Sequence, residues 1–170
     1  VERPIPQWKD YGVKTLATMN GRGVVKAPLP YNAQFTPVID ITDPVGGTLI
    51  RIETDHVHGG SDNCIRAEYI TRKGRQQYES LGWMNGDTLY IRYPQESSLT
   101  VHSVAFRETG YNAEFKGKFH CSDDFVNRFR EKALRTLYVN MRDTYFDCPD
   151  RERAQWWGDV TILMGESFYQ

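Results

Sequence analysis

The sequence predicts a mainly β protein with helices at its C-terminal end, and two observations carry this prediction. Between Gly12 and about Phe119, apolar and polar residues alternate in short runs separated by turns, which is typical of antiparallel strands with one better-buried face. From Ser122 onward, apolar residues recur every three or four positions, which indicates helix. We therefore expect an antiparallel β-sandwich or barrel followed by helices.

The expected strands cover residues 49–54, 65–71, 77–83, 88–93 and 98–106. Lys73-Gly74 is expected to turn the second of these runs into the third as a hairpin. Asn85-Gly86-Asp87 is expected to form the turn of a further hairpin, because these residue types tolerate positive φ angles. Short strands separated by turns, with no helical period between them, favour the antiparallel sandwich.

The helical part begins with a capping signal. Ser122-Asp123-Asp124 offers an N-cap and two carboxylates for the first turn, and the apolar stripe that follows predicts a helix of about twenty residues. A second helix is expected to start after Gly158, with Asp159 as its N-cap, and to be still in progress at the last residue. The change of period predicts a β-sandwich domain over residues 1–119 and a helical part over residues 120–170. The amphipathic first helix needs a partner that packs on it.

Length and charge limit the function classes. The 170 residues suffice for a core without disulfides or structural metal. The net charge of −1, with no run of like charges, argues against nucleic acid or anionic membrane as partner, and no stretch approaches the ~20 apolar residues of a membrane span. Cys64, Cys121 and Cys148 fit neither a zinc site nor a disulfide framework, so three free thiols are expected. The two ends of the sequence favour a piece excised from a longer chain.

The connection between the two expected helices, residues 147–159, holds four carboxylates, two arginines and two tryptophans. Crowded carboxylates raise one another's pKa, so that one can stay protonated as a general acid while the arginines keep others ionised. Glycosidic bond cleavage needs that division of labour, and flat tryptophan rings pack on the C–H faces of sugars. A purely structural interpretation also stands, in which Asp159 is only an N-cap, the arginines pair with Asp147 and Asp150, and the tryptophans anchor a core.

This connection carries a specific motif. Asp147-Cys148-Pro149-x-Arg151-Glu152-Arg153, followed by Trp156-x-Gly158-Asp159, closely resembles the signature of bacterial α-L-rhamnosidases of the inverting, six-hairpin α/α-barrel type. Residues 82–86, 107–111 and 135–143 are similar to this family's β-sandwich and its junction with the barrel. The resemblance runs from about Trp8 to the end. It implies that the helices are the first of an (α/α)6 barrel.

The resemblance implies a role for each polar residue of the motif. Glu152 would be the general acid that protonates the glycosidic oxygen. The hydroxyl groups of rhamnose would be hydrogen-bonded by Asp147, Arg151 and Asp159, and Trp156 would pack on the sugar ring.

Some members of the family carry one extra residue between the positions of Arg151 and Glu152, which makes Asp150 a second candidate for the acid. Glu152 is favoured because Arg153 follows it, as the pattern demands. An inverting mechanism also needs a general base, a carboxylate ~6.5–9.5 Å from the acid. The resemblance implies that this base is a Glu farther along the barrel, outside this chain. We therefore expect the 170 residues alone to be catalytically inert, and the rest of a parent chain to pack on the helical part. The implied substrate is terminal α-L-rhamnose on an oligosaccharide or glycoside.

Other interpretations concern the β part. It is expected to be a structural domain that braces the barrel, although a lectin-like module in which Trp8 and Trp83 contact sugar is an alternative. The motif Asp55-His56-Val57-His58, with Asp62 nearby, has the residue types of a metal site. A solvated strand end is favoured, because no third and fourth ligand can be placed. We expect neither a metal nor a cofactor.

Overall fold

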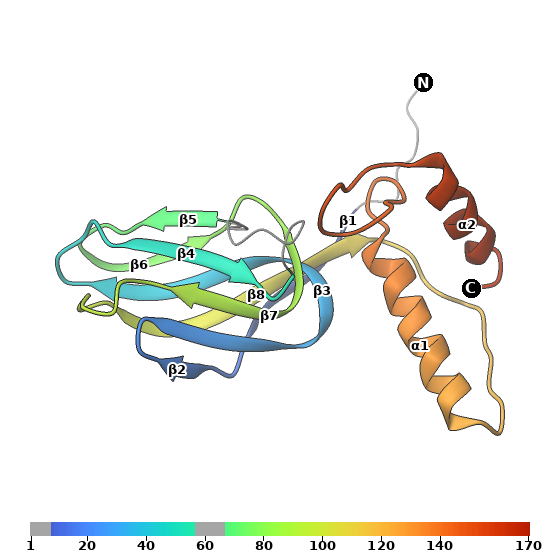
Figure 1. The fold of residues 1–170 in the computed structure, drawn as a ribbon, viewed down its shortest axis with the longest axis horizontal. Coiled ribbons are helices and arrows are strands. Elements are labelled where there is room, and N and C mark those ends of the chain that lie inside the picture. The colour runs from blue at the N-terminus through green and yellow to red at the C-terminus, as the bar shows by residue number, and fades with distance from the viewer. Residues whose placement is uncertain (1–7, 57–66) are drawn as a thin grey trace. The chain divides into compact units, whose positions relative to one another are not determined.

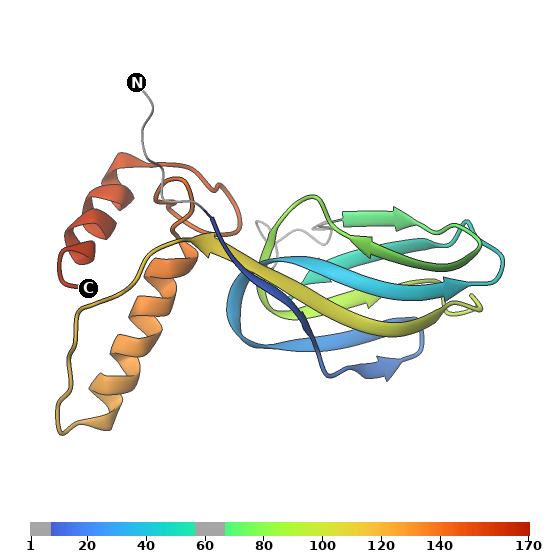
Figure 2. The same cartoon turned by 180° about the vertical axis from the view of Figure 1, so that it is seen from behind.

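The computed structural model describes residues 8–56 and 67–170 and divides the chain into two compact units (Figures 1 and 2). The unit Asp10–Thr109 is built of strands. The other unit combines Gly110–Gln170, which carries both helices, with Trp8 and Lys9. The expected domain division at residue 119 stays a prediction.

The strand unit is an antiparallel sheet of eight strands that curls into two layers. The strands are β1 (Trp8–Thr15), β2 (Met19–Gly21), β3 (Val24–Asp43), β4 (Leu49–Thr54), β5 (Ala67–Ile70), β6 (Gly74–Glu79), β7 (Met84–Arg92) and β8 (Thr100–Tyr111). Their order in the sheet is β1-β8-β3-β7-β4-β5, and both β2 and β6 pair with β3 as well.

The long strand β3 belongs to both layers. Its first half pairs with β2 and β7, from Val24 to Pro28, whereas its second half pairs with β8 and β6, around Val38 and Ile41. A register shift against β7 between Pro28 and Ala33 marks the passage from one layer to the other. One layer is thus β2-β3-β7-β4-β5 and the other β1-β8-β3-β6, as the long ribbon of β3 in Figure 1 shows.

The core lies between these two layers. In β4 the side chains of Ile50 and Ile52 are fully buried while Arg51 points outward, so the alternation seen in the sequence is the true inward and outward pattern. At the edges the layers meet through Tyr69 of β5 and Tyr78 of β6, whose rings stack with centroids 4.3 Å apart. The largest fully buried side chains include Phe35, Ile39, Ile41, Met84, Leu89, Ile91, Val104 and Phe106.

The expected hairpin turn at Asn85-Gly86-Asp87 is wrong. These residues lie inside β7, where Asn85 pairs with Gln34 and Gly86 with Ala33. The glycine serves close approach instead of a turn: a Cβ on Gly86 would lie 2.8 Å from the Asp55 side chain.

The expected hairpin at Lys73-Gly74 is half right. A turn is present, with Gly74 at a φ of 96°, but β5 pairs with β4 whereas β6 pairs with β3. The turn therefore leads from one layer to the other. Ile65 and Arg66, which the sequence places in the strand before it, lie outside the described residues.

The first helix, α1 (Asp124–Val139), starts as its capping signal predicts, with the Asp123 carboxylate accepting the Phe125 amide at 2.8 Å. Its last turn is buried, whereas Phe125 and Phe129 in the first half stack on each other and are exposed. The helix is 16 residues long, shorter than expected.

The second helix, α2 (Trp157–Ser167), begins before the expected start, so the assignment of Asp159 as N-cap is wrong. Trp156 occupies the cap position, but its side chain does not cap an amide of the helix, and Asp159 lies in the first turn, where the helix dipole favours a carboxylate. The expectation that the chain stops inside this helix is also wrong, because α2 ends at Ser167 with Phe168 as its C-cap. Within residues 8–56 and 67–170, neither helix has the length and apolar character needed to cross a membrane.

Candidate active site

Residues 147–154, here named the acid loop, are closed at their base by two hydrogen bonds. The Asp147 amide donates to the Ala154 carbonyl at 3.0 Å, and the Ala154 amide donates to Oδ1 of Asp147 at 2.9 Å. Just before the loop, the amide of the buried Phe146 donates to the carbonyl of Asn140, the C-cap residue of α1. The loop is thus anchored to the end of α1, and its side chains are held within a short span.

Glu152 is the centre of the polar contacts in this loop. Its Oε1 accepts from Nη2 of Arg151 at 2.8 Å, and its Oε2 accepts from the indole Nε1 of Trp156 at 3.1 Å. Its backbone amide donates to Sγ of Cys148 at 3.3 Å, which holds the main chain at this point. The side chain is still 41% exposed, so the carboxyl group is accessible to a ligand.

The hydrogen bonds that Asp147 accepts affect its pKa. Burial raises the pKa of Asp147, but the backbone amide of Ala154 and the Cys148 side chain outweigh it and hold that pKa below its usual value. The lowered pKa keeps Asp147 ionised near neutral pH, as the hydrogen-bond acceptor at the base of the loop.

Four of the five residues predicted for the site come together in this way: Asp147, Arg151, Glu152 and Trp156. Asp159 lies exposed in the first turn of α2 and takes no part in these hydrogen bonds. The structural interpretation fits less well. Arg151 pairs with Glu152, and Trp156 and Trp157 are 56% and 72% exposed, so neither ring is a core anchor within the described residues.

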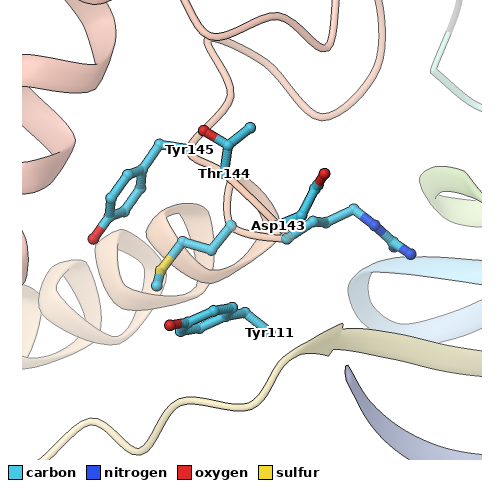
Figure 3. A pocket seen from close by; sticks show the side chains of 6 residues that line it. Tyr111, Asp143, Thr144 and Tyr145 are labelled. Atoms are coloured by element: carbon cyan, nitrogen blue, oxygen red, sulfur yellow. The ribbon is translucent and has the colours of Figure 1, made fainter. Parts of the chain in front are cut away.

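The segment just before the acid loop lines a small cavity, which the sequence analysis did not predict. It measures about 120 Å³ and is lined by Tyr111 and by the turn from Met141 to Tyr145 (Figure 3). In that turn the guanidinium of Arg142 stacks on the Trp8 ring, 4.0 Å from its centroid. The pKa of Arg142 is lowered to about 10, chiefly by burial, with the nearby charge of Arg153 acting in the same direction and that of Asp143 opposing it. The motif-like segment 135–143 contains this arginine, but no composition signal separates it from an ordinary helix end.

Of the other polar groups singled out in the sequence, Cys121 and Cys148 are free thiols, and Cys64 lies outside the described residues. His58 and Asp62 lie outside them as well, whereas Asp55 and His56 follow β4.

The described chain is an antiparallel sandwich followed by two helices, and the loop between the helices places Glu152 beside an exposed tryptophan. Residues 114–169 match the family model described as the bacterial alpha-L-rhamnosidase 6 hairpin glycosidase domain. The chain is also 34% identical over 53 residues to an alpha-L-rhamnosidase of Formosa agariphila, a match that covers 31% of this chain. The resemblance inferred from the acid-loop motif is thereby confirmed.

Solved structures give the same result for the fold. A GH78 family rhamnosidase of Bacillus sp. GL1 matches with a TM-score of 0.72 and 24% identity over 86% of this chain. The alpha-L-rhamnosidase from Dictyoglumus thermophilum matches with a TM-score of 0.73 and 18% identity over 96%. The rhamnosidase from Klebsiella oxytoca with rhamnose bound matches with a TM-score of 0.71 and 13% identity over 87%. The predicted fold class, a sandwich followed by the first barrel helices, is confirmed.

The chain is short beside these proteins. It spans 6% of the Formosa agariphila protein and 16%, 20% and 33% of the three solved chains.

Proposed function

We propose that this chain supplies the general-acid half of an inverting α-L-rhamnosidase active site, with Glu152 as the acid. The substrate is a glycoside or oligosaccharide that ends in α-L-rhamnose. Asp147, Arg151 and Asp159 hydrogen-bond the sugar hydroxyls, and Trp156 packs on the ring. The general base is a carboxylate outside these 170 residues.

The proposed reaction is a single displacement. Glu152 gives its proton to the glycosidic oxygen as the bond from that oxygen to C1 breaks. A water molecule forms the new bond to C1 from the opposite face and loses a proton to the general base, so the anomeric configuration inverts. Glu152, left as a carboxylate, is held by Arg151 and Trp156 until it takes up a proton from solvent.

One observation carries the choice of acid: the carboxyl group of Glu152 is oriented by Arg151 and Trp156 and is still 41% exposed to a ligand. The indole of Trp156 adds to it, because the same ring that donates to Oε2 of Glu152 is more than half exposed and available to a sugar. The family match over residues 114–169 contains the whole acid loop and supports the substrate class. The match to a Klebsiella oxytoca rhamnosidase with rhamnose bound supports it as well.

The proposal extends to the organisation of the chain. Residues 1–119 form the sandwich domain that precedes the barrel, and residues 120–170 form its first helices. Further helices of the parent chain cover the exposed apolar side chains of this part. These side chains are Phe125 and Phe129 of α1, Ile162 of α2 and Phe168, the C-cap of α2. Without those helices and the general base, these residues alone do not hydrolyse rhamnosides.

The second candidate function is a non-catalytic one, in which the sandwich binds carbohydrate or only braces its neighbour. It predicts no role for Glu152 in turnover. The two functions are separated by Glu152→Gln in the longest available form of the protein, assayed on two α-L-rhamnosides whose leaving groups differ in basicity.

We expect Glu152→Gln to lower turnover of a rhamnosyl disaccharide by about 10²–10⁴-fold. Turnover of a dinitrophenyl rhamnoside should fall much less, because a weakly basic leaving group needs no proton. The matched control is Glu166→Gln, an exposed carboxyl of α2, which should leave both rates unchanged. Equal losses on the two substrates, or a larger loss in Asp150→Asn, would overturn the assignment of the acid.

A further inference from the structure

The strand unit holds a second group of titratable side chains. Asp55 and His56 follow the end of β4, and Asp87 lies on the neighbouring strand β7. One ligand-type atom from each of the three lies within 4.8 Å of the other two. Nε2 of His56 lies 3.5 Å from Oδ2 of Asp87.

A buried asparagine fixes the hydrogen on the His56 ring. Asn85 is fully buried, and its amide nitrogen donates to the Ala33 carbonyl at 3.0 Å and to Oδ1 of Asn32 at 2.8 Å. The Asn85 side-chain oxygen therefore faces Nδ1 of His56, 2.7 Å away, and Nδ1 is the nitrogen that donates. Nε2 of His56 then lies 3.5 Å from Oδ2 of Asp87 and 3.5 Å from Nδ2 of Asn32, so a cation bound between His56 and Asp87 would replace the Asn32 amide as the partner of these two atoms.

Hydrogen bonds also orient the carboxylates of Asp87 and Asp55. Oδ2 of Asp87 accepts from Nδ2 of Asn32 at 3.1 Å. Oδ1 of Asp55 accepts from the backbone amides of Asp87 and Thr88, at 2.9 and 3.0 Å. Each of the three side chains is thus held by a group that is not itself a ligand, which is the usual support around a protein metal site.

The distance between Nε2 of His56 and Oδ2 of Asp87 suits a small divalent cation. For ligand bonds of about 2.0–2.1 Å in a tetrahedron, two ligand atoms lie about 3.4 Å apart, close to the 3.5 Å between His56 and Asp87. Three protein ligands leave the fourth position to water. The approach of β4 to β7 that creates this geometry requires Gly86, because a Cβ there would lie 2.8 Å from Oδ1 of Asp55.

We propose that Asp55, His56 and Asp87 bind a divalent cation of the Zn²⁺ type, which cross-links the end of β4 to β7. One imidazole and two carboxylates form a donor set that Zn²⁺ and Co²⁺ accept. The site is independent of Glu152 and does not require the proposed rhamnosidase activity. It acts on the stability of the sandwich.

The test uses Co²⁺ and Zn²⁺ with the 170-residue chain after chelator treatment and alkylation of its thiols. We expect one equivalent of Co²⁺ to bind, with visible absorption bands of a four-coordinate ion, and to be displaced by Zn²⁺. At a Zn²⁺ concentration about 100 times its dissociation constant, the midpoint of thermal unfolding should rise by at least about 4 °C.

The ligand variants are His56→Gln and Asp87→Asn, and His120→Gln, which removes an exposed imidazole elsewhere, is the matched control. We expect at least a tenfold loss of Co²⁺ affinity in the first two and none in the control. Unchanged affinity in both ligand variants, or no binding by the unaltered chain at millimolar metal, would overturn the proposal and leave a simple His56–Asp87 ion pair.

A measurement on the unaltered chain keeps the proposal testable if a variant does not fold. Zn²⁺ should change the ¹⁵N chemical shift of Nε2 of His56 far more than that of Nδ1. A change confined to other histidines would contradict the site.

Discussion

The carboxylate of Asp147 accepts the backbone amide of Ala154 at 2.9 Å, and the amide of Asp147 donates back to the carbonyl of Ala154 at 3.0 Å. This two-bond closure brings Glu152 back toward Asp147 and sets the span of the acid loop. Asp147 therefore has a structural task in addition to its proposed contact with the sugar.

The closure predicts different behaviour for two substitutions at Asp147. Asp147→Ala removes the acceptor of the Ala154 amide, whereas Asp147→Asn retains an oxygen at Oδ1. Because a hydrogen bond to a charged group contributes about 1.5–3 kcal/mol, we expect the Ala154 amide to exchange with deuterium at least tenfold faster in Asp147→Ala. In Asp147→Asn the exchange should stay within a few-fold of the unaltered chain. Similar exchange rates in all three proteins would show that the side chain does not close the loop.

The pairing of Asp40 with Arg75 predicts a dependence of stability on pH. Two hydrogen bonds from the Arg75 guanidinium, with a third from Gln77, lower the pKa of Asp40 to about 2. An unfolded chain has an Asp pKa of about 3.9. The folded state thus favours the ionised form, so the contribution of Asp40 to stability is present above about pH 4 and is lost as the pH falls toward 2.

Urea unfolding of the chain at intervals between pH 5 and pH 2 measures this effect. We expect the free energy of unfolding to fall less steeply with decreasing pH in Asp40→Asn than in the unaltered chain, because the asparagine does not titrate. Parallel pH profiles for the two proteins would rule out Asp40 as a source of the acid sensitivity.

The close packing around Gly86 predicts that alanine will lower the free energy of unfolding more at Gly86 than at the nearby Gly82. Gly86→Ala would place a Cβ 2.8 Å from the side chains of Asp55 and Thr54, whereas a Cβ on Gly82 would have no neighbour within 4 Å. We expect Gly86→Ala to lower the free energy of unfolding by about 1–3 kcal/mol. Gly82→Ala should change it by less than about 0.5 kcal/mol in the same urea titration. Equal effects of the two substitutions would mean that β4 does not approach β7 as closely as described.

The parts of the fold that were predictable from the sequence depend on local patterns. The inward and outward alternation of β4 and the capping of α1 by Asp123 are settled by residues within a few positions. The expected turn at Asn85-Gly86 failed because the preference of these residues for a turn is also local, while their partners in the ladder, Gln34 and Ala33, lie 51 and 53 residues earlier. The passage of β3 through both layers has no local signal at all.

The candidate site follows the same rule. Asp147, Arg151, Glu152 and Trp156 lie within ten residues of one another, so one loop brings them together and their types revealed the chemistry. Asp55 and Asp87 are 32 residues apart and meet only through the register of β4 against β7. The sequence motif Asp55-His56-Val57-His58, with Asp62 nearby, therefore gave no signal for Asp87 as a ligand.

The shared strand β3 also has a consequence for how the sandwich folds. Because one continuous backbone supplies a central strand to each layer, neither layer can lose its hydrogen bonds along β3 without exposing the apolar face of the other. The two layers should therefore behave as a single foldon, with one cooperative transition for the strand unit. Tolerance to insertion is then concentrated in the connections between strands, while the backbone of β3 itself accepts none.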